Sequence, residues 1–166
     1  MDADGLITSL GLLPHPEGGF YRETYRSAAI IPAEGLDARY GGRRHVCTGI
    51  LYLLREGDTS RLHRIRQDEM WHSYLGGPLR LAMLGGDAPA REVLLGSDIR
   101  AGHEVQFVVP GGVWFGATPA ADAGFCLVGC TVAPGFEFED FEMGSRASLE
   151  RMFPQAKEMI REFCPE

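Results

Sequence analysis

The sequence has no long apolar run and no excess of basic residues, and both absences exclude classes of protein. No segment approaches the roughly 20 apolar residues that span a bilayer. The 166 residues carry a formal net charge of −7, whereas nucleic acids and anionic membranes select basic surfaces. We therefore expect neither a nucleic-acid partner nor a membrane partner.

The sequence also predicts no signal peptide, and it contains few cysteines. The first 14 residues are acidic and lack both a basic n-region and a cleavage-site pattern. We expect a cytoplasmic protein whose four cysteines are reduced. Cys126 and Cys130 lie about 13 Å apart along a predicted strand, too far for both to bind one metal ion. We interpret them as small buried hydrophobic residues.

No repeat, low-complexity segment or linker divides the chain, which predicts a single domain over residues 1–166. Its 22 glycines and ten prolines separate short β-branched and aromatic runs, a pattern typical of a β-sandwich or barrel. We expect an all-β core with short N-terminal and C-terminal helices. The predicted helices cover 2–12, 149–153 and a segment that begins at Pro154. The predicted strands cover 20–27, 45–55, 79–84, 91–95, 104–109, 113–118, 124–132 and 136–141, with a turn at 85–87.

The predicted strand at 45–55 is apolar on both of its faces. Such a strand usually packs on a second sheet with one face and on another structure with the other. A second copy of the chain is a natural candidate, which makes a homodimer our expectation.

A proline- and glycine-rich loop at 14–19 contains His15 and Glu17. Its two prolines hold the backbone extended, and the two glycines that follow release it. The loop can present His15 and Glu17 for a function or can form a structural corner. From the residues alone we favour the corner.

The richest concentration of reactive side chains lies at 57–77. We predict a hairpin in which Arg61, His63 and Ile65 share one face of the first strand. Glu69, Trp71 and Ser73 would share the facing side of the second strand. His63 and Glu69 would then lie opposite each other, where they could act as base and acid or bind a metal ion.

Two segments resemble the motifs of the cupin superfamily. The first motif reads Gly-x5-His-x-His-x3-Glu-x6-Gly, and its spacing is matched by Gly57, His63, Ile65, Glu69 and Gly76. The second, Gly…Pro-x-Gly-x-x-His, is similar to 102–115. More narrowly, the chain resembles the uncharacterised cupin-5 family through LGLLPHPEGGF at 10–20, DEMWH at 68–72 and VVPGGVWFGA at 108–117.

The resemblance implies a cupin double-stranded β-helix, or jelly roll, with a small-molecule pocket inside the barrel. It also implies a homodimer. Metal-binding cupins use two histidines and a glutamate of the first motif and a histidine of the second. Here Ile65 and Phe115 occupy two of these positions, so we expect no metal cofactor. The alternative is a divalent metal bound by His63, Glu69 and His72, which would need a β-bulge to turn His72 inward.

Without a metal, the chain is similar to sugar-nucleotide epimerases of the same fold, which use a histidine base. His63 would be the base and Glu69 its partner or the acid. Arg61 would bind an anionic group of the ligand. The remaining predicted binding residues form an aromatic wall, a rim and the pocket surface: Trp71, Trp114, Phe115, Tyr21, Glu23, Gln106, Ile65 and Ser73.

Three functions therefore stay open. The first is a metal-independent isomerase or epimerase-like enzyme that acts on a sugar-like or carboxylated metabolite. The second is a metal-dependent enzyme with a non-standard ligand set. The third is a protein that binds or senses a small ligand without catalysis.

Overall fold

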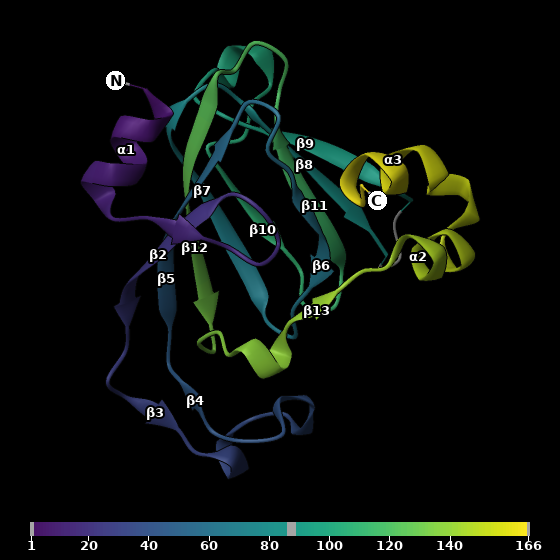
Figure 1. The fold of residues 1–166 in the computed structure, drawn as a ribbon. Coiled ribbons are helices and arrows are strands. Elements are labelled where there is room, and N and C mark those ends of the chain that lie inside the picture. Colours follow the sequence, from purple (N-terminus) through teal and green to yellow (C-terminus); the bar gives the residue numbers. More distant parts are fainter. Residues whose placement is uncertain (1, 86–88, 166) are drawn as a thin grey trace.

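The computed structural model describes residues 2–85 and 89–165, and most of the strands in this part of the chain form two facing sheets (Figure 1). In these residues one sheet has six strands, in the order β1-β2-β5-β12-β7-β10, and the other has five, in the order β13-β6-β11-β8-β9. The six-stranded sheet comprises Leu13–Pro14, Phe20–Arg26, Thr48–Arg55, Phe125–Ala133, Asp68–Gly76 and Gln106–Val109. The five-stranded sheet comprises Glu142–Met143, Ser60–Arg64, Trp114–Pro119, Leu79–Leu84 and Arg91–Leu95.

The strand order defines a jelly roll. Strands far apart in the sequence are neighbours, as β5 is with β12 and β6 is with β11, and both of these pairs are antiparallel. The short pair β3 (Ile30–Ile31) and β4 (Arg44–His45) extends from one end of the barrel (Figure 1). The predicted all-β cupin jelly roll is thus confirmed.

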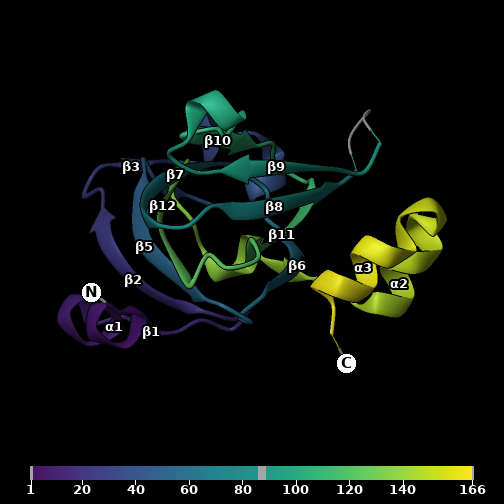
Figure 2. The same ribbon diagram turned by 90° about the horizontal axis from the view of Figure 1, so that it is seen from above.

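Short helices cover the outside of both sheets (Figure 2). Helix α1 (Ala3–Leu10) lies outside the six-stranded sheet, where Asp2 caps it and Gly11 ends it in a left-handed conformation. Helices α2 (Arg146–Met152) and α3 (Lys157–Phe163) lie outside the five-stranded sheet, and Ser145 caps α2. None of the helices in the described residues is long and apolar enough to cross a membrane.

The N-terminal helix explains why β5 is apolar on both faces. Leu53 of β5 is fully buried in a cluster with Leu6 of α1, Leu12 and Leu127. The outer face of this strand therefore packs on α1 of the same chain. The homodimer stays a prediction, but the apolar outer face of β5 no longer requires it.

Two predictions about the strands are wrong. Strands β6 and β7 belong to different sheets, so residues 57–77 cross the barrel and do not form a hairpin. Residues 136–141 were expected as a strand, but they contain the 3-10 helix η4 (Phe138–Asp140). The other predicted strands form within a few residues of their expected ends. Gly86 and Asp87 of the predicted 85–87 turn lie outside the described residues.

The interior is divided between a packed end and a hollow end. Each long strand contributes to both: Leu54 of β5 and Trp71 of β7 are buried in the core, whereas Ile50 and Glu69 on the same strands line a pocket. Inward-facing residues two positions apart are about 6–7 Å apart along a strand. A short shift along the strand therefore separates the core from the pocket.

Candidate functional site

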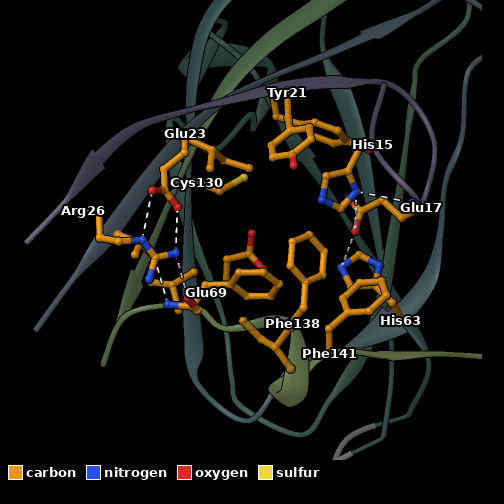
Figure 3. Close-up of a pocket in the computed structure, with 16 residues that line it drawn as sticks. His15, Glu17, Tyr21, Glu23, Arg26, His63, Glu69, Cys130, Phe138 and Phe141 are labelled. Atoms are coloured by element: carbon orange, nitrogen blue, oxygen red, sulfur yellow. Dashed lines mark hydrogen bonds and ion pairs between the residues drawn. The ribbon is translucent and has the colours of Figure 1, made fainter. Parts of the chain in front are cut away.

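The pocket inside the barrel has a volume of about 310 Å³. That is at the small end of the roughly 300–1,000 Å³ range of ligand sites. Figure 3 shows its side chains around a central space, with His15, Glu17 and His63 on one side and Glu23 and Arg26 on the opposite side. The lining residues are His15, Glu17, Tyr21, Glu23, Arg26, Thr48, Ile50, Tyr52, His63, Ile65, Glu69, Cys130, Val132, Phe136, Phe138 and Phe141.

The loop at 14–19 brings Glu17 into this pocket. Gly18 has a φ of 118°, and a Cβ at this position would lie 2.1 Å from the carbonyl oxygen of Thr59. The backbone N–H of Arg61 donates to the carbonyl of Glu17 at 2.9 Å, and the hydroxyl of Tyr52 donates to that of Gly18 at 2.7 Å. The loop is therefore held against β6, with the Glu17 side chain directed inward.

A β-bulge in β6 decides which of its side chains face the pocket. Phe115 of β11 pairs with His63, but Ala117 pairs with Ser60, so β6 has one additional residue over this interval. The bulge places both Ser60 and His63 inside the barrel, although they are three residues apart. Leu62 instead packs in the cluster beneath the C-terminal helices, and Arg61 is exposed.

His63 and Glu17 form a buried acid–base pair. His63 Nδ1 lies 2.7 Å from the carbonyl oxygen of Arg61, which can only accept, so Nδ1 carries a proton. His63 Nε2 lies 3.2 Å from Oε2 of Glu17. A hydrogen bond between these two atoms needs one proton, held by either the imidazole or the carboxyl group. The hydroxyl of Ser60 donates to Oε1 of Glu17 at 2.9 Å and orients the carboxyl group.

His15 packs beside this pair as a second imidazole. Its Nδ1 accepts the backbone N–H of Glu17 at 3.3 Å, and its ring makes an edge-to-face contact with Tyr21 at 4.5 Å. Burial lowers the pKa of His15, and the charge of Glu17 opposes this shift only in part. A neutral His15 whose Nδ1 accepts a hydrogen bond carries its proton on Nε2.

Glu69 faces the pocket from β7 in the opposite sheet, close to Cys130. Burial, with a further contribution from the negative charge of Glu17, raises the pKa of Glu69 to about 8. Burial also raises the pKa of the Cys130 thiol, and the neighbouring Glu69 adds to that shift. Both side chains are therefore protonated at neutral pH in the absence of a ligand.

Aromatic side chains form much of the pocket wall. Residues i and i+3 of a 3-10 helix lie above one another, so η4 and the residue after it present Phe138 and Phe141 to the same cavity. Phe136, Tyr21 and Tyr52 complete the wall. The ring of Phe141 lies 5.2 Å from that of His63, and Phe138 stacks on His15 at 6.4 Å.

An ion-pair network anchors the segment that carries these phenylalanines. Asp140 is buried and accepts hydrogen bonds from Nε and Nη2 of Arg44, at 2.8 and 2.7 Å. The side-chain amide of Gln67 donates to the same carboxylate at 2.6 Å. Arg44 is itself 2 % exposed, so the pair depends on mutual compensation of charge. The aromatic wall is thereby fixed to β4 and to the segment between the sheets.

Five of the predicted site residues line the pocket: His63, Ile65, Glu69, Tyr21 and Glu23. The structure changes the predicted partner of His63 from Glu69 to Glu17, because β6 and β7 do not form a hairpin. Phe115 contacts the His63 ring at 4.1 Å, but it is buried in the core with Trp71 and does not line the pocket.

The other predicted binding residues lie elsewhere. Trp114 follows the strand alternation to the opposite side from Phe115 and packs under the C-terminal helices. Arg61 donates to the carbonyl of Pro16 at the surface and is not among the residues that line this pocket. Ser73 lies beyond Trp71 on β7, away from the pocket. Gln106 pairs with His72 outside the barrel.

The alternative metal site is not assembled. His72 Nε2 lies 3.0 Å from the hydroxyl of Thr131, and Gln106 contacts His72 Nδ1 at 2.9 Å, both on the outer face. Hence His63, Glu69 and His72 do not converge. Two of the metal-ligand positions implied by the cupin resemblance hold Ile65 and Phe115, so the residues do not fit the usual cupin metal. Among the described residues, no group of three or more His, Cys, Asp or Glu side chains is arranged to hold a metal ion.

The fold and the pocket define a jelly-roll protein with an enclosed site between its sheets. Residues 4–144 match the family described as Cupin superfamily (DUF985). The chain belongs to this family. A relative in Saccharomyces cerevisiae, named only as an uncharacterized protein, is 30% identical over 145 residues, which are 81% of this chain and 71% of the relative.

Solved structures of similar proteins agree with this assignment. A hypothetical protein from Leishmania major is 38% identical, with a TM-score of 0.91 and full coverage of both chains. A Shewanella oneidensis protein is 39% identical, with a TM-score of 0.88 and coverage of 100% of this chain and 99% of that chain. Oxalate decarboxylase from Bacillus subtilis is 13% identical, with a TM-score of 0.55, over 90% of this chain and 36% of that chain. This last likeness concerns the fold alone.

Several pocket residues were not predicted as site residues. The interpretation of the loop at 14–19 as a structural corner leaves His15 and Glu17 out of the predicted site. Strand alternation places Arg26 on the face opposite Tyr21 and Glu23, and a β-bulge between Glu23 and Tyr25 turns it toward the pocket. The positions of Phe138 and Phe141 depend on a 3-10 helix, which the alternation of aromatic and acidic residues at 136–141 concealed.

Proposed function

We propose that this protein binds a small polar metabolite inside the barrel and transfers a proton on it with the His63–Glu17 pair, without a metal cofactor. The reaction would be isomerase- or epimerase-like. The observation that carries the proposal is the 3.2 Å contact between His63 Nε2 and Glu17 Oε2 at a pocket surface. An imidazole and a carboxyl group in contact can together take a proton from a bound ligand and return it.

The surroundings support a role in proton transfer. Nδ1 of His63 is fixed by the Arg61 carbonyl, which sets the tautomer, and Ser60 orients Glu17. A general base works best when its tautomer and its position are fixed before the substrate binds. The aromatic wall supplies an apolar surface for the body of a ring-shaped or branched ligand.

Solvent deuterium exchange tests the proposal. The protein is incubated in D2O with pools of sugars, acids and amines, and NMR detects ligands that bind and any that gain deuterium on carbon. We expect deuterium incorporation with at least one bound ligand. Because a positioned acid or base contributes roughly 10²–10⁴-fold, His63→Gln and Glu17→Gln should slow incorporation by at least about 100-fold.

His72→Gln is the matched control, since it makes the same substitution at a histidine on the outer face. We expect it to keep the wild-type exchange rate. Binding without any exchange, unchanged in His63→Gln, would support the non-catalytic alternative. Exchange that is lost on chelation and restored by a divalent metal would support the metal-dependent alternative. Either result would contradict the proposal.

A further inference from the structure

The charges that face the pocket favour one class of ligand. Among the described lining residues, Arg26 is the only arginine or lysine. Its Nε and Nη2 donate to Glu23 at 2.9 and 2.8 Å, and its Nη1 donates to Glu137 at 2.6 Å. The carbonyl of Phe136 accepts a further hydrogen bond from Nη2. Arg26 is thus already paired with two carboxylates, Glu23 on the pocket lining and Glu137 behind it, and adds no net positive charge to the pocket.

The opposite wall supplies no excess positive charge. His63 Nε2 lies 3.2 Å from the carboxyl group of Glu17, so a positive charge on this imidazole would be offset by the Glu17 carboxylate. His15 is uncharged at neutral pH, because burial lowers its pKa. Cys130 and Tyr52 face the pocket as neutral groups, since burial raises the pKa of both. Glu69 then adds a further acidic group that is 7 % exposed.

Aromatic rings surround this acidic space. Phe136, Phe138 and Phe141 contact one another at 5.1–6.4 Å between ring centroids, and Tyr21 and Tyr52 lie on the other side of His15. The faces of aromatic rings attract cations, and rings grouped in a cage are a recurrent site for quaternary ammonium groups. A neighbouring carboxylate strengthens this attraction where water is excluded.

We propose that the pocket takes a ligand with a positively charged ammonium group, held by the carboxylate of Glu69 and by the faces of the surrounding aromatic rings. This inference rests on the proposed function only in that both use the same pocket. An anionic ligand would have to displace Glu23 or Glu137 from Arg26, and above the Glu69 pKa of about 8 it would also meet the negative charge of Glu69. A neutral ligand would use the aromatic rings without the charge of Glu69.

Binding of a cation is linked to the ionisation of Glu69. In the free protein the Glu69 carboxyl group is protonated below a pKa of about 8. The ammonium group favours the ionised form of Glu69, so below that pKa the binding of the ligand releases the Glu69 proton. Affinity for a permanent cation should therefore be constant above pH 8 and fall by about tenfold for each pH unit below it.

Three probes of the same shape separate the ligand classes: choline, its neutral analogue 3,3-dimethylbutan-1-ol, and the anion 3,3-dimethylbutanoate. Dissociation constants are measured by NMR titration at pH 8.5 and 6.5. We expect choline to bind at least about tenfold more tightly than either analogue at pH 8.5, and to lose more than about tenfold at pH 6.5. The affinity for the alcohol should not change with pH.

Two variants assign the interaction to its residues. Glu69→Gln should weaken choline binding by at least about tenfold at pH 8.5 and remove its pH dependence, whereas the exposed Glu34→Gln should change neither. Phe138 is 54 % exposed, so Phe138→Ala can be made without opening the core. It should weaken choline binding severalfold and keep the pH dependence.

Three outcomes would overturn the inference: no choline binding, an analogue that binds as tightly as choline at pH 8.5, or choline affinity that does not depend on Glu69. Tight binding of the alcohol or the anion would leave the proton-transfer proposal standing, because deuterium exchange tests that proposal separately. Choline binding without any deuterium exchange would support this inference and contradict the proton-transfer proposal.

Discussion

Replacement of Glu69 by glutamine should change how the stability of the protein depends on pH. Burial raises the pKa of Glu69 from 4.5 to about 8 in the folded protein. Below pH 4.5 the group is protonated in both the folded and the unfolded state, so its ionisation costs nothing. As the pH rises, the unfolded state releases this proton first, and the folded state loses stability until the pH passes 8.

The magnitude follows from the size of the shift. One pKa unit corresponds to about 1.4 kcal/mol, so Glu69 should cost the folded state roughly 2 kcal/mol at pH 6 and about 4–5 kcal/mol at pH 8. Glutamine has a similar shape and does not ionise. The free energy of unfolding of Glu69→Gln should therefore exceed that of the parent protein by an amount that grows across this range.

Urea unfolding of the parent, Glu69→Gln and the exposed Glu34→Gln at pH 5, 6, 7 and 8 measures this dependence. Subtracting the free energy of unfolding of the parent from that of the variant at each pH cancels the contribution of the other titrating groups. Glu34→Gln should follow the parent throughout. A Glu69→Gln difference that stays constant within about 0.5 kcal/mol from pH 5 to pH 8 would refute the reasoning, since Glu69 would then ionise as easily when folded.

Two further substitutions test the elements that hold the pocket. Gly18→Ala should destabilise the fold by about 1–3 kcal/mol, because a Cβ there would lie 2.1 Å from the Thr59 carbonyl oxygen. It should also lower the rate of deuterium exchange. A thermal unfolding midpoint equal to that of the parent protein would contradict this. Asp140→Asn should cost about 3–5 kcal/mol in urea unfolding because it removes the buried partner charge of Arg44 and leaves the exposed Glu139 beside it. A decrease in the free energy of unfolding below about 1 kcal/mol would show that Arg44 does not depend on the charge of Asp140.

The fold was accessible from the sequence because its signals are local. Alternation of residues indicated most of the strands, and the spacing around His63 and Glu69 indicated the cupin jelly roll. The role of α1 was not accessible in this way. Two apolar faces on β5 show that both are covered, but the pattern does not distinguish a helix of the same chain from a second copy.

The site was harder to predict because it depends on contacts between distant segments. The partner of His63 lies 46 positions earlier in the chain, in a loop whose proline and glycine pattern also suits a structural corner. A β-bulge in β6 turns Ser60 inward and leaves Arg61, which was expected to face the pocket, exposed at the surface. Strand alternation assumes a regular ladder, so it cannot give the direction of a side chain beyond a bulge.

The central claim, that His63 and Glu17 transfer a proton on a ligand in the barrel, is tested most directly by a crystal structure with a bound ligand. The ligand would be one that gains deuterium in the exchange screen. The account predicts that the exchanging carbon lies within about 3.5 Å of His63 Nε2 or a Glu17 carboxylate oxygen, with the aromatic rings against the rest of the molecule. A ligand bound outside the barrel, or with its exchanging carbon directed away from both residues, would contradict it.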